Sequence, residues 1–208
     1  MLFYWLNLVG IFFFTISGSL AARDKKHYHD YFGVFFTGFI TAIGGGTLRD
    51  MMLGAYPISW LSDKNILISI ICAFLFTLVF KNYIIKLRRT LFLFDTVGVG
   101  IYTILGVQIS LEHHVNPFAA IILGLISAVF GGVIRDTLIN EIPLIFAKEI
   151  YATACIAGAV LFTTLLYFNI NSNVAAIISM SLIIIIRIIA VKYKLALPKF
   201  DAKNETID

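Results

Sequence analysis

The stretch Gly45-Gly46-Thr47-Leu48-Arg49-Asp50 recurs 86 residues later in the chain as Gly131-Gly132-Val133-Ile134-Arg135-Asp136. Further pairs of residues match at the same offset of 86, namely Gly38–Gly124, Thr41–Ser127 and Pro57–Pro143. A second set matches at an offset of 88, namely Asn7–Asp95, Gly10–Gly98, Thr15–Thr103 and Gly18–Gly106. Two offsets that differ by two residues indicate a short insertion or deletion in a loop. The sequence therefore predicts an internal duplication that repeats a polar motif inside apolar segments.

The composition indicates a membrane protein. Hydrophobic residues make up 60% of the 208 residues and charged residues 13%, whereas soluble domains have about 45–50% and about 25%. Spans of about 20 apolar residues are long enough to cross a bilayer as helices. The sequence predicts an all-α membrane protein with seven transmembrane helices, at 2–22, 31–54, 65–80, 91–110, 117–139, 149–168 and 174–192. Residues 1–198 form one transmembrane domain, and 199–208 form a cytoplasmic tail.

The distribution of lysine and arginine predicts the orientation. If the N-terminus lies outside, twelve basic residues fall on the cytoplasmic side and only Lys64 falls outside. Cytoplasmic loops carry such an excess, so we expect the N-terminus outside and the C-terminus in the cytoplasm of a bacterial or archaeal cell (inner) membrane. The span 2–22 lacks a positive region before it, which indicates an uncleaved first helix rather than a signal peptide. The basic segment 81–90 is expected to extend the third helix at the interface.

The duplication has a geometric consequence. Three spans separate equivalent points, so the first repeat (about 1–80) and the second (about 90–168) run in opposite directions, and the helix at 174–192 lies outside them. Inverted repeats commonly place a substrate or ion site near the midplane where they meet. We therefore expect the site between the second and fifth helices.

Two interpretations of the glycines remain open. Adjacent glycines weaken a helix, so they predict kinks in the second and fifth helices that line a cavity, at Gly44, Gly45, Gly46, Gly131 and Gly132. The alternative is close helix packing through small residues. On the cavity interpretation, a leucine at Gly45 or Gly131 blocks passage and leaves assembly intact.

The arginines also have two interpretations. Thr41 and Arg49 share one helical face, as do Ser127 and Arg135. Together with the hydroxyls of Thr15, Ser17 and Thr103, these side chains are candidates to line or gate a path. The alternative is structural pairing of each arginine with an aspartate of another helix.

The nearby carboxylates and the last arginine complete the candidate set. Asp50 and Asp136 are expected to support the arginines. Asp95 is either an interfacial charge or an acid at the inner mouth. Arg187 lies near Lys192 and is expected to be an interfacial anchor.

Nothing in the sequence indicates an enzyme. The four histidines lie in loops outside any metal-binding or catalytic pattern, and no phosphate-binding or dinucleotide motif is present. Cys72 and Cys155 are expected to be small buried hydrophobic residues. No cofactor, metal or nucleic acid partner is expected.

At these motifs the chain resembles the prokaryotic branch of the trimeric intracellular cation (TRIC) channels. The resemblance rests on GGGTLRD at 44–50, GGVIRD at 131–136, the proline seven residues after each aspartate, FDTVG at 94–98 and the basic end of the last helix. It implies a homotrimer in membrane lipid, with one pore per protomer that passes monovalent cations, mainly potassium, with bound lipid as a further ligand. Phe130 replaces the first glycine of the second repeat, so we expect the fifth helix to be less broken. The lysine motif of animal members is absent, so lipid regulation through it is not expected.

Two other function classes remain open. A secondary transporter of a small solute or ion would use the same midplane site between inverted repeats. A structural or assembly protein would carry no flux.

Overall fold

The fold is all helical. The computed structural model describes residues 1–23, 30–84, 90–146 and 150–195, and no strand occurs within these ranges. The elements are α1 (Leu2–Arg23), α2 (Tyr31–Leu53), α3 (Ser59–Ser62), α4 (Lys64–Ile84), α5 (Thr90–Glu112), α6 (Pro117–Leu138), the 3-10 turn η1 (Leu144–Phe146), α7 (Ala152–Tyr167) and α8 (Ser172–Tyr193). This confirms the predicted all-α class.

Among the described residues, seven long helices correspond to the predicted spans, with differences at their ends. Within the described ranges, α1, α2, α5, α6 and α8 have the length and hydropathy to cross a membrane, whereas the apolar parts of α4 and α7 are shorter. At 1.5 Å per residue, the 16 residues of α7 span about 24 Å, less than the roughly 30 Å hydrocarbon core. The count of seven crossings therefore stays a prediction. Helix α4 does continue into the basic segment as far as Ile84, and the rest of that segment, 85–89, and the tail from 199 lie outside the described residues.

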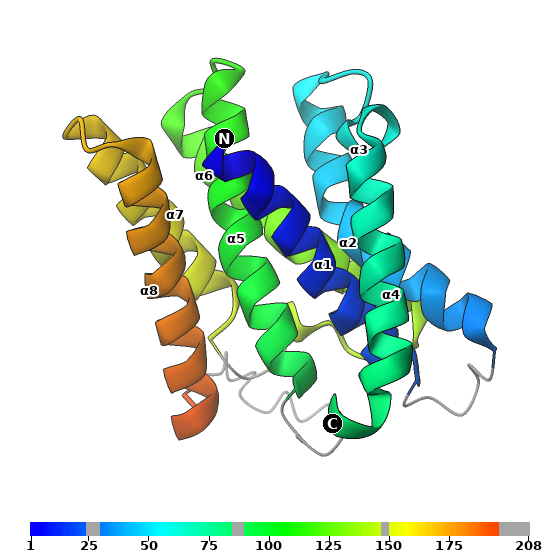
Figure 1. Cartoon of the computed structure of the whole chain (residues 1–208). Coiled ribbons are helices and arrows are strands. Elements are labelled where there is room, and N and C mark those ends of the chain that lie inside the picture. The colour runs from blue at the N-terminus through cyan, green and yellow to red at the C-terminus, as the bar shows by residue number, and fades with distance from the viewer. Residues whose placement is uncertain (24–29, 85–89, 147–149, 196–208) are drawn as a thin grey trace, which may run out of the picture.

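The two repeats run in opposite directions. In Figure 1, α1 and α4 descend and α2 ascends, whereas the corresponding α5 and α7 ascend and α6 descends. Helix α1 packs against α5, and α2 packs against α6, so the repeats meet along two equivalent pairs of helices. Helix α8 lies outside the duplication and packs against α7 and α5.

The apolar side chains separate into a core and an outer face. The core lies where the repeats meet and includes Ile11, Phe14, Ala42, Val99, Val107 and Ala128. On α4, by contrast, Ile68, Ile71, Leu75 and Val79 are exposed, as expected for a surface in contact with lipid or a partner chain. Cys155 is buried as expected, but Cys72 is exposed on α4, so the expectation for Cys72 was wrong.

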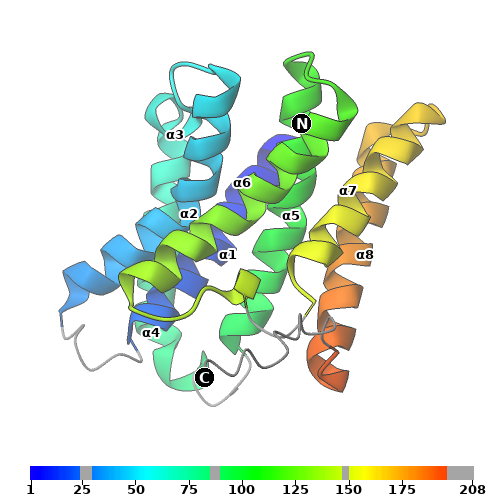
Figure 2. The ribbon, with the colours of Figure 1, turned by 180° about the vertical axis from the view of Figure 1, so that it is seen from behind.

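Two short elements were not predicted. Helix α3 begins two residues after Pro57, and η1 begins directly after Pro143. Each follows the helix that carries an Arg-Asp pair, in the loop that leads to the next long helix. Figure 2 shows α2 and α6 from the opposite side, with the segment after α6 returning toward the bundle.

Candidate functional site

The glycines allow α2 and α6 to touch through their backbones. A Cβ atom at Gly45 would overlap the carbonyl oxygen of Ser127, and one at Gly131 would overlap the carbonyl oxygen of Thr41. Both helices stay helical through these positions, so they do not unwind. Close packing, the alternative to the cavity interpretation, is therefore the arrangement at Gly45 and Gly131, while a kink at these glycines stays a prediction.

The next glycine of each motif faces a polar cluster instead. A Cβ at Gly46 would lie 3.7 Å from Nη2 of Arg49, and one at Gly132 would lie 3.6 Å from Nη2 of Arg135. A Cβ at Gly44 would lie 3.0 Å from Cδ1 of Ile134 on α6. In each glycine pair, therefore, one glycine lies at the contact between α2 and α6 and the other lies beside an arginine.

The first cluster, here called the Arg49 station, comprises Arg49, Asp50, Ser59 and Ser127. Nε and Nη2 of Arg49 donate to Oδ1 of Asp50 at 2.9 and 2.6 Å, and Nη1 donates to Oγ of Ser127 at 3.2 Å. The other oxygen of Asp50 accepts from the backbone N–H and the hydroxyl of Ser59 at 3.1 and 2.7 Å. The carboxylate therefore neutralises the arginine and also holds the start of α3.

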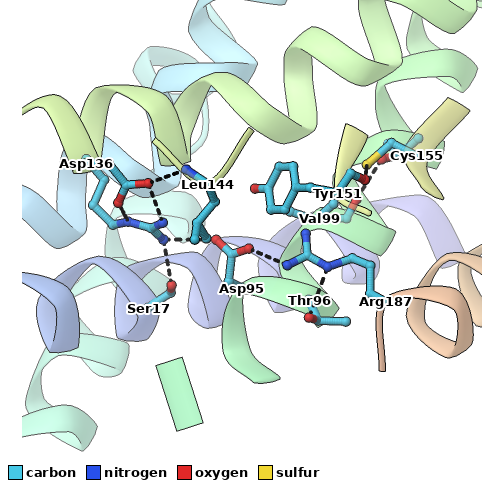
Figure 3. A network of polar contacts seen from close by, with 11 residues as sticks. Ser17, Asp95, Thr96, Val99, Asp136, Leu144, Tyr151, Cys155 and Arg187 are labelled. Atoms are coloured by element: carbon cyan, nitrogen blue, oxygen red, sulfur yellow. Dashed lines mark hydrogen bonds and ion pairs between the residues drawn. The ribbon is translucent and has the colours of Figure 1, made fainter. Parts of the chain in front are cut away.

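The second cluster, the Arg135 station, comprises Arg135, Asp136, Asp95 and Ser17 (Figure 3). Nε of Arg135 donates to Asp136 at 2.7 Å, and Nη1 donates to Oδ1 of Asp95 and to Oγ of Ser17, both at 2.9 Å. Asp136 also accepts from the backbone N–H of Leu144 at 3.1 Å, which holds the start of η1. Each Arg-Asp pair thus secures the loop that follows its helix.

The pairing differs in part from the expectation. Arg49 binds the aspartate next to it on its own helix, rather than one on another helix. Arg135 does both, because it binds its neighbour Asp136 and also Asp95 on α5. Asp95 is completely buried, so of the two roles considered for it, the interfacial charge is wrong.

Arg187 is not an interfacial anchor. Only 2% of its surface is exposed, and its Nη2 donates to Oδ2 of Asp95 at 3.1 Å while its Nε donates to Oγ1 of Thr96 at 3.1 Å. Its guanidinium also lies over the Tyr151 ring, 4.0 Å from the centroid. Sequence reasoning missed the pairing of Arg187 with Asp95. Arg187 lies within one and a half helical turns of Lys192, so its side chain was expected to extend to the membrane interface. The unmatched carboxylate of Asp95, which aligns with the neutral Asn7, was the signal that could have revealed it.

The predicted hydroxyls divide into two groups. Ser17 and Ser127 reach the arginines, as described above. Thr15, Thr41 and Thr103 instead donate to the backbone carbonyl four residues earlier in their own helices, at 2.8, 2.6 and 2.8 Å. All are fully buried, and their role in lining a path stays a prediction.

A recess lies beside the Arg49 station. It is lined by side chains of α1, α2, α5 and the α3 region, among them Asn7, Arg49, Trp60 and Tyr102, together with Gly46, and it has room for about one or two water molecules. The Tyr102 hydroxyl donates to Asn7 at 3.0 Å on its wall. The corresponding position in the second repeat contains Asp95 together with Arg187.

Comparisons with known proteins place the chain in a family. A family model described as Glycine transporter matches residues 4–82 and 92–167. The chain belongs to this family. Its relatives include the UPF0126 inner membrane protein YadS of Escherichia coli K12, 38% identical over 96% of this chain and 97% of that protein, and a UPF0126 membrane protein of Vibrio cholerae, 38% identical over 96% and 83%. YvgT of Bacillus subtilis is 30% identical over 75% and 77%.

Solved structures of TRIC channels share the fold along nearly the whole chain. The TRIC orthologue from Rhodobacter sphaeroides superposes with a TM-score of 0.87 at 30% identity, covering 93% of this chain and 99% of that one. A structure reported for conductance through TRIC cation channels has a TM-score of 0.86 at 34% identity and covers 98% and 100%. The predicted resemblance to the prokaryotic TRIC family is confirmed. The expectation of a protein that is not an enzyme is confirmed as well, because these relatives are channels.

Proposed function

We propose that the protein is a passive channel for monovalent cations, mainly potassium, with one path in each protomer of a homotrimer. The observation that carries the proposal is the pair of buried, neutralised Arg-Asp stations, one on α2 and one on α6, at the contact between inverted repeats. The solved structures that share this fold are described as trimeric cation channels, which supports the same function here.

The ion pairs explain how arginines are compatible with cation passage. A bare guanidinium 4 Å from a cation would raise its energy by about 4 kcal/mol at an effective dielectric constant near 20. Arg49 and Arg135 each have a carboxylate oxygen at 2.6 or 2.7 Å, so most of this repulsion is cancelled. Hydroxyls and backbone carbonyls at the α2–α6 crossing are then the groups that meet the ion.

The path we propose passes between α2 and α6. Its narrowest point is the backbone contact of Gly45 with Ser127 and of Gly131 with Thr41, so conduction requires the two helices to separate there. The protein resides in the inner membrane of a bacterium, as YadS does, with its N-terminus outside and its C-terminus in the cytoplasm.

Purified protein in liposomes and planar bilayers tests the proposal. We expect potassium currents in discrete steps and a potassium flux far faster than transporter turnover, with choline excluded. Arg49→Gln should change the conductance or the open probability. Folded protein that passes neither current nor potassium flux in either system would refute the channel function.

Glycine transport is the second candidate, and the description of the family favours it. The recess beside Arg49 fits this alternative, because an Arg-Asp pair, an amide and two aromatic rings can hold a small zwitterion. Its room for about one or two water molecules is less than the five non-hydrogen atoms of glycine need, so glycine binding requires the recess to widen. Saturable uptake of labelled glycine into the same liposomes, without channel currents, would favour the transporter. Absence of both activities would favour a structural role.

A further inference from the structure

The two stations are related by the duplication but differ in formal charge. Asn7 of the first repeat aligns with Asp95 of the second. The Arg49 station is neutral, because one arginine faces one carboxylate. In the second repeat, Arg135 faces both Asp136 and Asp95, so the repeat alone would carry one excess negative charge.

Arg187 supplies the missing positive charge from outside the duplication. It extends from α8 to Oδ2 of Asp95, the carboxylate oxygen that Arg135 leaves free. The guanidinium is held by one carboxylate oxygen, the Thr96 hydroxyl and the faces of two aromatic rings, with the Tyr151 centroid at 4.0 Å and the Phe92 centroid at 5.2 Å. Figure 3 shows Arg187 between Asp95, Thr96 and Tyr151.

The two arginines that share Asp95 are held to different degrees. Arg135 donates to two oxygens of Asp136, one of Asp95 and one of Ser17. Arg187 donates to only two oxygens, and its buried Nη1 has no hydrogen-bond partner among the described residues. A buried donor without a partner is costly, so Arg187 is the less firmly bound of the two. It is also near the end of α8, where a long side chain can extend to the interface.

We infer that Asp95, Thr96 and Tyr151 form a binding site for a monovalent cation, and that the Arg187 guanidinium occupies this site in the present conformation. A carboxylate oxygen, a hydroxyl oxygen and an aromatic face are ligands that attract a weakly hydrated cation. The inference deepens the proposed function, on which it rests, by naming a cation site beside the path. Arg187 thus acts as a tethered cation that a free cation replaces when the side chain moves away.

Removal of the Arg187 charge tests the site through binding rather than flux. Thermal unfolding of purified Arg187→Gln protein is measured in potassium chloride and in choline chloride at equal ionic strength. The variant leaves Asp95 with an uncompensated charge, so potassium is expected to raise its midpoint by about 3–5 °C at a concentration about ten times the Kd. The matched controls are the parent and Arg187→Lys, in which the site stays occupied, and the double variant Arg187→Gln/Asp95→Asn, which has no excess charge. These controls should show no potassium-specific shift.

Each outcome bears on one claim. Equal midpoints of Arg187→Gln in the two salts, or a potassium shift that persists in the double variant, would overturn the site. If Arg187→Gln folds only when potassium is present, the site is supported; if it fails in both salts while the double variant folds, the site is overturned. A potassium shift in Arg187→Gln together with a parent protein that passes no potassium would refute the channel and leave the site standing. Normal potassium flux through the parent protein, with no potassium shift in Arg187→Gln, would refute the site and leave the channel function standing.

Discussion

The adjacent glycines of each motif should respond oppositely to the same substitution. A methyl group at Gly45 would overlap the Ser127 carbonyl oxygen, whereas one at Gly46 would lie 3.6 Å from Cε1 of Tyr102, an ordinary contact. We predict that Gly45→Ala destabilises the protein and that Gly46→Ala does not. The second repeat offers the same comparison, because a methyl group at Gly131 would overlap the Thr41 carbonyl oxygen, whereas one at Gly132 would lie 3.4 Å from the Tyr151 hydroxyl, an ordinary contact.

The size of the stability loss in Gly45→Ala follows from the atom that the new methyl group would meet, which is a backbone carbonyl oxygen. A backbone carbonyl cannot rotate away as a side chain can, so α2 and α6 must move apart, and overpacking of this kind costs about 1–3 kcal/mol. Replacement of glycine by alanine inside a helix gains roughly 0.5–1 kcal/mol, but this gain is common to both positions. The difference between Gly45→Ala and Gly46→Ala is therefore the overpacking cost alone, about 1–3 kcal/mol. A leucine at Gly45 would cost more than an alanine, and the expectation that it leaves assembly intact stays a prediction.

Reversible unfolding with sodium dodecyl sulfate, followed by circular dichroism, provides the measurement. Gly46→Ala is the matched control for Gly45→Ala, and Gly132→Ala is the control for Gly131→Ala. The double variant Gly45→Ala/Gly131→Ala should cost less than the sum of its parts, since one separation of α2 and α6 relieves both overlaps. Equal stability of Gly45→Ala and Gly46→Ala would show that the helices do not meet at this glycine.

Three further predictions concern charge, orientation and assembly. Either loss of Arg49 or loss of Arg135 leaves one uncompensated buried carboxylate, which costs about 3–5 kcal/mol. Arg135→Gln should still lower the thermal unfolding midpoint more than Arg49→Gln, because Arg135 connects two carboxylates and a hydroxyl on three helices, whereas Arg49 connects one carboxylate and one hydroxyl; equal midpoints would contradict this. Single cysteines introduced at Asn116 and Lys203 in a cysteine-free background should react with an impermeant reagent in whole cells at Asn116 only, and labelling at both sites would contradict the basic-residue argument. Detergent-corrected mass measurement should give a trimer, and a monomer or dimer in several mild detergents would count against it.

Much of the fold could be predicted because the bilayer imposes simple rules. Apolar spans of about 20 residues become helices, and the recurrence of Gly45–Asp50 at Gly131–Asp136 revealed the duplication. An odd number of helices per repeat then required the inversion that the structure has. The short α3 and η1 could not be predicted in this way, since each depends on the side chain of an aspartate that accepts from its backbone.

The sequence by itself determined the class of protein, the location of its two polar motifs and the need to neutralise their arginines. The tertiary structure alone decided the partners, because hydrogen bonds and ion pairs depend on atoms that meet within about 3 Å from different helices. It placed Gly45 against the Ser127 backbone rather than beside a cavity. It also brought Arg187, 92 residues away in the chain, to Asp95, a contact that no pattern of hydropathy or spacing along one helix can specify.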